Sequence, residues 1–139
     1  MRISLALFSI AVWLGNCDAS ASCLPFNGVK NLRGTLIEKS FPGPPNYESI
    51  KVGDKEERFW LLRTEEVICV DKDPEDENGA NVGLRHITEI QLVLLADGYR
   101  RYRHLLGKPV QLSGSFFSAH TGHHKTPVLL DQPTIKALQ

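Results

Sequence analysis

The sequence has no excess of charge of either sign. Its 16 Lys and Arg side chains balance 16 Asp and Glu side chains, so the formal net charge at pH 7 is +0. Proteins that bind nucleic acids usually carry a basic face, because contacts with phosphates supply much of the affinity. We therefore expect no nucleic-acid partner.

Long apolar segments are also scarce. The longest apolar run, residues 3–15, is shorter than the roughly 20 residues that a membrane-spanning helix needs. It follows the basic start Met1-Arg2 and precedes Ala19-Ser20-Ala21, a small-x-small cleavage site. This order is typical of a secretory signal peptide. We predict a signal peptide over residues 1–21 and one domain over residues 22–139.

Two other interpretations of the N-terminal segment remain open. It could be a buried helix, although the polar residues Asn16 and Asp18 interrupt the apolar pattern abruptly. It could also be the leader of a lipoprotein, but Asn16 is a poor match to a lipobox before Cys17. We expect a periplasmic or secreted bacterial protein, with no membrane span once the leader is removed.

Cysteine is rare as well. The chain has three cysteines, and Cys17 would leave with the leader. Cys23 and Cys69 remain as an even pair in an oxidising compartment, which favours a disulfide over two free thiols. Closing a loop of this length stabilises a fold by about 4 kcal/mol in the chain-entropy model.

Alternating apolar residues predict several strands. Residues 32–39 form the first. Residues 58–62 form the second, which breaks near 64–66 and resumes at 67–70. Residues 87–94 form the third, after an acidic turn at 71–79.

A short helix and a hairpin follow. Tyr99, Tyr102 and Leu106 have helical spacing, Asp97-Gly98 can cap the helix, and Gly107 is a natural stop. Strands four and five lie on either side of the loop at 118–126, and a further extended piece follows Pro133.

The element order is strand, strand, strand, helix, strand, strand. We predict a mostly β fold, a five-stranded OB-like barrel with one short helix between strands three and four. An open sheet with a packed helix is the alternative. In the barrel, the loops after strands one and four border the ligand-binding face.

These two loops are the unusual parts of the sequence. The first, residues 41–50, contains three prolines and a glycine, which forbid regular structure. The second carries His120-Thr121-Gly122-His123-His124. Residues 114–130, together with 41–50 and 68–70, resemble a bacterial family of exported proteins known as domain of unknown function 4431. The resemblance implies an exported bacterial protein and supplies no activity.

The histidines support two interpretations. His120, His123 and His124 could bind zinc or copper, since imidazole suits both metals. Alternatively, the three side chains make structural contacts with their own loop and with the proline-rich loop. Lys125 stands where the family pattern leads us to expect a further histidine, which disfavours a metal cluster.

We therefore predict a small exported binding module of unknown ligand, without a resident cofactor. Its partner would be a protein, peptide or glycan of the envelope, and an inhibitor or immunity protein of an envelope enzyme is one form of it. Catalysis is not expected, because nucleophile-elbow and metalloprotease motifs are missing. The predicted ligand-binding residues are Asn46, Tyr47, His120, Thr121, His123 and His124.

Overall fold

The computed structural model describes residues 23–76 and 83–139. The predicted signal peptide, residues 1–21, lies outside the described residues, as does part of the acidic turn. The elements are β1 (Val29–Pro42), η1 (Ile50–Val52), β2 (Glu56–Val70), β3 (Leu84–Val93), α1 (Ala96–Tyr102), η2 (Arg103–Leu105), β4 (Pro109–Ser118) and β5 (Val128–Ala137).

The five strands form one sheet that closes on itself in the order β1-β2-β3-β5-β4. The C-terminal part of β1 pairs with β2 and its N-terminal part pairs with β4, so this one strand belongs to both sides of the sheet. The remaining pairs are β2 with β3 and β4 with β5, both antiparallel, and β3 with β5, which is parallel. The mostly β fold with a helix between strands three and four is thus confirmed.

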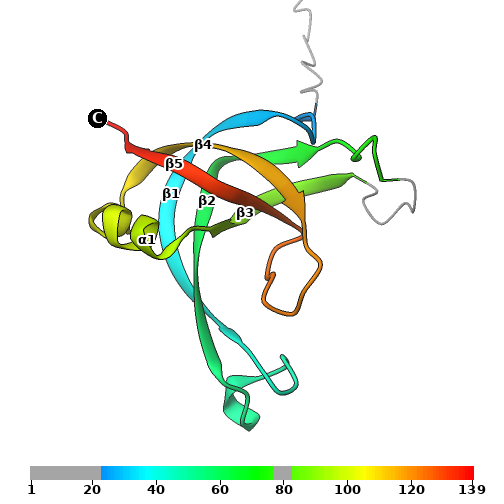
Figure 1. Ribbon diagram of the computed structural model, residues 1–139, viewed down its shortest axis with the longest axis vertical. Helices are drawn as coiled ribbons and strands as arrows, with labels where there is room; N and C mark the ends of the chain where they lie inside the picture. The colour runs from blue at the N-terminus through cyan, green and yellow to red at the C-terminus, as the bar shows by residue number, and fades with distance from the viewer. Residues whose placement is uncertain (1–22, 77–82) are drawn as a thin grey trace, which may run out of the picture.

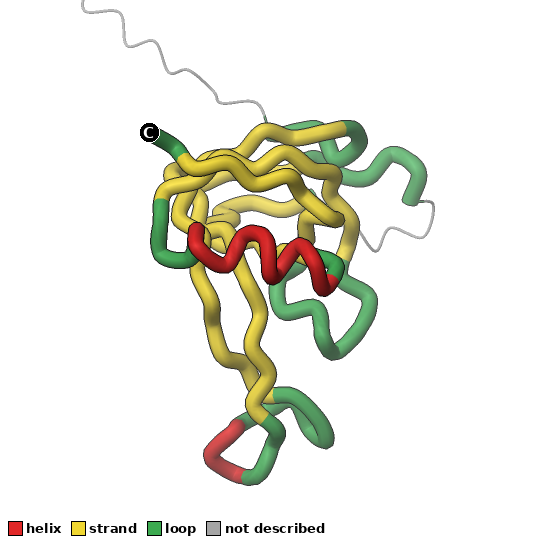
Figure 2. Tube along the Cα trace, turned by 60° about the vertical axis from the view of Figure 1, so that its left-hand side comes forward, coloured by secondary structure: helices red, strands yellow, loops and turns green. Residues whose placement is uncertain are grey.

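The β1–β2 hairpin is longer than the rest of the sheet. β1 and β2 have 14 and 15 residues, whereas each of the other strands has 10. The hairpin therefore extends from the body as an arm (Figures 1 and 2). We name its end, residues 43–55, the β1–β2 loop, and we name residues 119–127 the β4–β5 loop.

The interior of the sheet is filled by alternate residues of all five strands. Each strand contributes a side chain that is 0 % exposed: Leu36, Leu62, Ile90, Leu112 and Leu130. Burying an aliphatic side chain of this size contributes about 1.5–3 kcal/mol. Adjacent aromatic residues divide between the two faces: Trp60 and Phe116 are buried, while Phe59 and Phe117 are partly exposed.

The helix covers one end of this core. Tyr99, Tyr102 and Leu106 pack against it, as their spacing predicted. The Tyr99 ring meets the Trp60 ring edge-on at 5.1 Å between centroids. Gly107 ends the segment with φ 78, a left-handed conformation that glycine adopts readily. Among the described residues, no helix is long and apolar enough to cross a membrane.

Three local predictions were wrong. Asp97-Gly98 does not cap the helix, because α1 begins at Ala96 and these two residues lie inside its first turn. β2 does not break at 64–66; the irregularity there is a shift in its register with β3. The piece after Pro133 is not separate, because β5 continues through it to Ala137. A register shift in the β4–β5 ladder accommodates the proline.

The predicted disulfide is present. Cys23 and Cys69 are bonded, with 4.7 Å between their Cα atoms. The next residue, Leu24, forms a parallel bridge with Val70. The bond therefore holds the start of the domain against the end of β2.

Candidate functional site

The β1–β2 loop is organised by one buried carboxylate. Asp54 Oδ1 accepts a hydrogen bond from the N–H of Asn46 at 2.9 Å, and Oδ2 accepts those of Glu48 and Ser49 at 2.7 and 2.8 Å. These N–H groups, that of Ser49 foremost, hold the pKa of Asp54 below its usual value despite burial. The loop is therefore ordered by Asp54 as well as by its prolines.

Tyr47 lies within this loop in a strained conformation. Its φ is 60, which is uncommon for a residue with a bulky side chain. Its N–H donates to Gly43 O at 2.9 Å, and its side chain is 38 % exposed. The Tyr47 side chain is therefore partly exposed at the surface of the β1–β2 loop.

The β4–β5 loop is fixed to the outer face of β3. Gln91, only 2 % exposed, donates from Nε2 to His123 O at 3.0 Å and accepts from the Lys125 N–H at 2.6 Å. The Gln91 N–H donates to Thr126 Oγ1 at 3.0 Å, and this hydroxyl donates to Val128 O at 2.7 Å. Gln91 therefore holds His123, Lys125 and Thr126 of the loop, and Thr126 in turn bonds Val128.

Lys125 joins the two loops. Its Nζ donates to Pro42 O at 2.9 Å, where β1 ends, and to Gly122 O at 2.7 Å in its own loop. A Glu57 carboxylate oxygen lies 3.8 Å away, and the Lys125 side chain is 9 % exposed. A cation so buried needs several partners, and these three groups supply them.

Aromatic contacts reinforce the junction. The Lys125 ammonium lies 4.7 Å from the centre of the Tyr47 ring and 5.8 Å from that of Phe59. Gly122 lies against Tyr47 so closely that a Cβ at position 122 would be 3.0 Å from two ring atoms. The absence of a side chain at this position is what lets the loops approach.

His123 also spans the two loops. Its Nδ1 lies 3.0 Å from Glu57 Oε1, and its ring meets that of Tyr47 edge-on at 5.8 Å between centroids. The imidazole is 55 % exposed, whereas the Glu57 side chain is 15 % exposed. A carboxylate thus orients the ring at Nδ1.

His120 and His124 form a separate pair. Their rings lie 4.6 Å apart between centroids, and both rings contact that of Phe117. His124 Nδ1 accepts the His120 N–H at 3.0 Å, and His120 Nδ1 lies 3.1 Å from Ser118 O. Burial, followed by the neighbouring histidines, lowers the pKa of His124.

The structure thus brings Tyr47 and His123 together between the two loops, and it places His120 and His124 as a pair in the same loop as His123. Asn46 and Thr121 make their hydrogen bonds within their own loops, to Asp54 and to the His123 N–H. The described residues contain no group of three or more His, Cys, Asp or Glu side chains positioned to hold a metal ion. The histidines make the backbone and inter-loop contacts that formed the alternative to metal binding. The arrangement can present aromatic and polar groups to a ligand from a fixed framework.

Sequence reasoning missed four residues that build the site. Asp54 is not among the predicted site residues, and Lys125 was noted only as a departure from the family pattern. Gln91 and Glu57 belong to strand faces that alternation predicts to be exposed. The one usable signal was Gln91, a polar residue within the otherwise apolar run 90–94.

Comparison with known proteins gives one match. Residues 89–136 match the family model described as Domain of unknown function (DUF4431), the family that the histidine loop resembles. The match includes Gln91 and the whole β4–β5 loop. It leaves out residues 41–50 and 68–70, so their resemblance stays a prediction. No curated protein and no solved structure matches the chain.

Proposed function

We propose that this chain is a small exported binding module, in which the β1–β2 and β4–β5 loops hold a ligand at one side of an OB-like barrel. The closed strand order, the parallel β3–β5 pair and the position of the helix all support an OB-like fold. Ligands of that fold contact the strand 2–3 face and the loops after strands one and four. The disulfide supports an oxidising location such as the periplasm.

The observation that carries the proposal is the fixed junction of the two loops. Lys125 hydrogen-bonds the end of β1 and its own loop, its ammonium lies over the Tyr47 ring of the β1–β2 loop, and Tyr47 packs against Gly122. A surface held in this way loses little conformational entropy when it binds, which favours recognition. Loops that served only as connections would not need a buried cation between them.

The exposed groups indicate the kind of ligand. Asn46, Tyr47, Thr121 and His123 combine an aromatic ring with hydrogen-bonding side chains. This combination suits a peptide, a glycan or the surface of another protein. An inhibitor or immunity protein of an envelope enzyme belongs to this class, and we assign the chain no catalytic role.

Binding of zinc or copper is the second candidate function, and the close approach of the His120 and His124 rings favours it. The hydrogen bonds count against it. Because His124 Nδ1 accepts an N–H, the neutral ring carries its proton on Nε2 and offers no lone pair there. Metal binding would have to break this bond.

Site-specific photocrosslinking tests the proposal. A photoreactive amino acid at Glu48, an exposed residue of the β1–β2 loop, should give a discrete adduct when the protein is expressed in its native host. The matched control is the same substitution at Arg100, exposed on α1. Equal labelling from both positions, or none from Glu48, would contradict a ligand surface at the loops.

Calorimetry separates the metal candidate. We expect neither Zn²⁺ nor Cu²⁺ to bind the purified protein more tightly than about millimolar, a weak affinity for a dedicated site. Tight binding that His120→Ala and His124→Ala abolish would replace the binding-module proposal with a metal site.

A further inference from the structure

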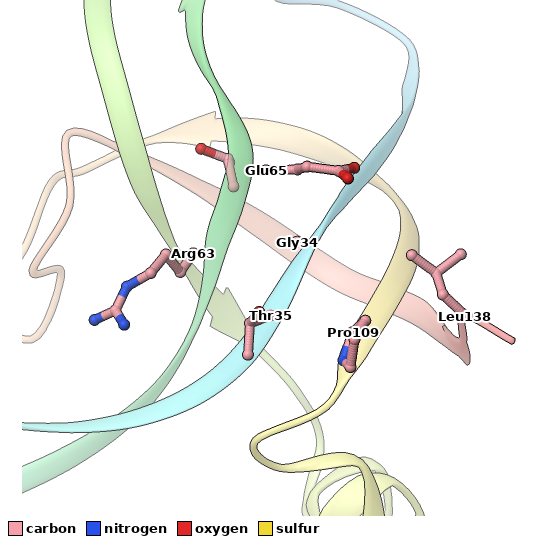
Figure 3. Close-up of a pocket in the computed structure, with 7 residues that line it drawn as sticks. Gly34, Thr35, Arg63, Glu65, Pro109 and Leu138 are labelled. Atoms are coloured by element: carbon pink, nitrogen blue, oxygen red, sulfur yellow. The ribbon is translucent and has the colours of Figure 1, made fainter.

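β1 and β2 separate at one position. Their last pair is Gly34 with Thr64, and a Cβ on Gly34 would lie 2.1 Å from Arg63 O. Beyond this point the N-terminal part of β1 pairs with β4, while β2 continues along β3. Figure 3 shows the two strands diverging beyond Thr35 and Gly34.

A groove opens between the diverging strands. Two hollows of about 320 and 260 Å³ share the lining residues Thr64 and Glu65. The larger is bounded by both strands and by Leu24: its other lining residues are Asn31, Leu32, Arg33, Glu66 and Ile68. The groove lies at the end of the β1–β2 ladder opposite to the β1–β2 loop.

The two walls of the groove carry charged side chains of opposite sign. Arg33 lines one wall, and Glu65 and Glu66 line the other. Among residues 23–76 and 83–139, no ion pair joins Arg33 to either glutamate. Within the described residues, β1 and β2 form no ladder pair on the groove side of Gly34 and Thr64, so their main-chain edges are not paired with each other there.

The β2 edge in this groove already accepts a main-chain partner at one end. The Leu24 N–H donates to Cys69 O, and the Asp71 N–H donates to Leu24 O, both at 2.8 Å. The main-chain groups that point to this side are thus those of Cys69 in β2 and of Asp71 just after it. Val67 lies two residues before Cys69 and is in no pair of the β1–β2 or β2–β3 ladder, so its N–H and C=O are the groups that we expect to be available on this side.

We propose that this groove binds an extended peptide segment of a partner protein, which adds as a strand to the β2 edge next to Leu24. Main-chain hydrogen bonds would supply the affinity, as in other complexes formed by strand addition. Leu24, Leu32 and Ile68 line the groove and fit apolar side chains at alternate positions of the peptide. The two glutamates against one arginine favour basic side chains at the positions between.

The site is independent of the ligand surface at the two loops. It uses the main chain of β2 and the end of the groove near the disulfide, and none of the junction residues. Either proposal can fail while the other holds.

A displayed library of random heptapeptides, selected on the purified disulfide-bonded protein, tests the inference. Selected peptides should alternate apolar and polar residues, with basic side chains among the polar ones. Bound peptide should shift and protect the amides of residues 31–33 and 65–68 in NMR spectra. It should leave the amides of the β1–β2 and β4–β5 loops unchanged.

Val67→Pro provides the decisive variant. It removes the edge N–H at a residue whose side chain is 61 % exposed, so no core contact is lost. We expect binding of the selected peptide to weaken at least tenfold. Val67→Thr is the matched control, because it keeps both the N–H and the branched shape, and it should bind within twofold of the parent protein.

Peptides N-methylated at alternate positions complete the test on the unaltered protein, should Val67→Pro fail to fold. N-methylation at one set of alternate positions should abolish binding, whereas N-methylation at the other set should not. Failure to select any peptide, equal binding of both methylated sets, unchanged binding by a folded Val67→Pro variant, or amide shifts confined to the two loops would each overturn the proposal.

Discussion

Lys125 Nζ donates a hydrogen bond of 2.9 Å to Pro42 O, across 83 positions of the sequence. The contact joins the end of β1 to the β4–β5 loop. Since the same ammonium also bonds Gly122 O, it fixes the curvature of its own loop while it holds the other. One ammonium group therefore holds both the end of β1 and the β4–β5 loop.

Replacing this ammonium should loosen both loops. We expect Lys125→Met to lower the free energy of unfolding by about 1–3 kcal/mol, because two carbonyl groups lose a charged donor. Urea denaturation measures the change. Lys136→Met, exposed on β5, is the control and should have an effect within about 0.5 kcal/mol. A Lys125→Met variant as stable as this control would contradict the assigned role.

The side-chain amide of Gln91 should contribute as much to the free energy of unfolding as the Lys125 ammonium. Gln91→Met keeps the length of the side chain but removes the partners of His123 O and the Lys125 N–H. We expect a loss of about 1–3 kcal/mol and faster hydrogen exchange at Lys125. Gln111→Met, a half-buried glutamine on β4, serves as the comparison. If exchange at Lys125 were equally slow in both variants, the amide would not be what holds the loop.

The β1–β2 loop should lose order in acid. Because the pKa of Asp54 is lowered in the folded state, its carboxylate stabilises the loop fully above the ordinary pKa of 3.8. That contribution is lost as the pH falls through the lower, folded value. Amide exchange at Asn46, Glu48 and Ser49 reports the change. Asp54→Asn should show fast exchange at these amides even at neutral pH, since an amide has one acceptor oxygen where the carboxylate has two.

The β4–β5 loop should also weaken as the pH falls, and this change should begin at a higher pH than the change in the β1–β2 loop. The folded pKa of His124 lies below its ordinary value of 6.5, so the neutral ring stabilises the loop above pH 6.5. The contribution disappears as the pH falls through the folded value, when Nδ1 takes up a proton and cannot accept the His120 N–H. His124→Asn should keep an acceptor near this position and remove the pH dependence. The chemical shift of the His120 amide, followed from pH 8 to pH 4, distinguishes the two proteins.

The disulfide should contribute strongly to stability. It closes a sequence separation of 46 residues, for which the chain-entropy model gives about 4 kcal/mol. We expect the Cys23→Ala/Cys69→Ala variant to lose most of that amount in urea denaturation. A loss below about 1 kcal/mol would show that the start of the domain contributes little to the fold.

Much of the fold could be predicted because its signals are local. Alternation in residues 32–39 and 87–94 marks strands whose inner faces are buried, and Tyr99, Tyr102 and Leu106 mark the helix by their spacing. The failures were also local. Pro133 suggested a break, and the register shift that absorbs it involves β4, which no single segment can indicate.

The candidate site was predictable only in outline. The two loops stand out in the sequence, since one is rich in proline and the other in histidine. Their junction depends on Asp54, Glu57, Gln91 and Lys125, polar residues that look like ordinary surface positions. Most of their partners lie between 5 and 83 positions away, so no local pattern reveals their roles.

The sequence by itself determined the strand and helix segments, the pair of cysteines that bond, and the two loops worth attention, because periodicity, residue count and backbone restriction act over short stretches of chain. Only the tertiary structure decided that Lys125 lies between the loops, that His123 is separated from the His120–His124 pair, and that β1 and β2 diverge beyond Gly34. These relations follow from sheet closure, which brings distant main-chain and side-chain groups within hydrogen-bonding distance.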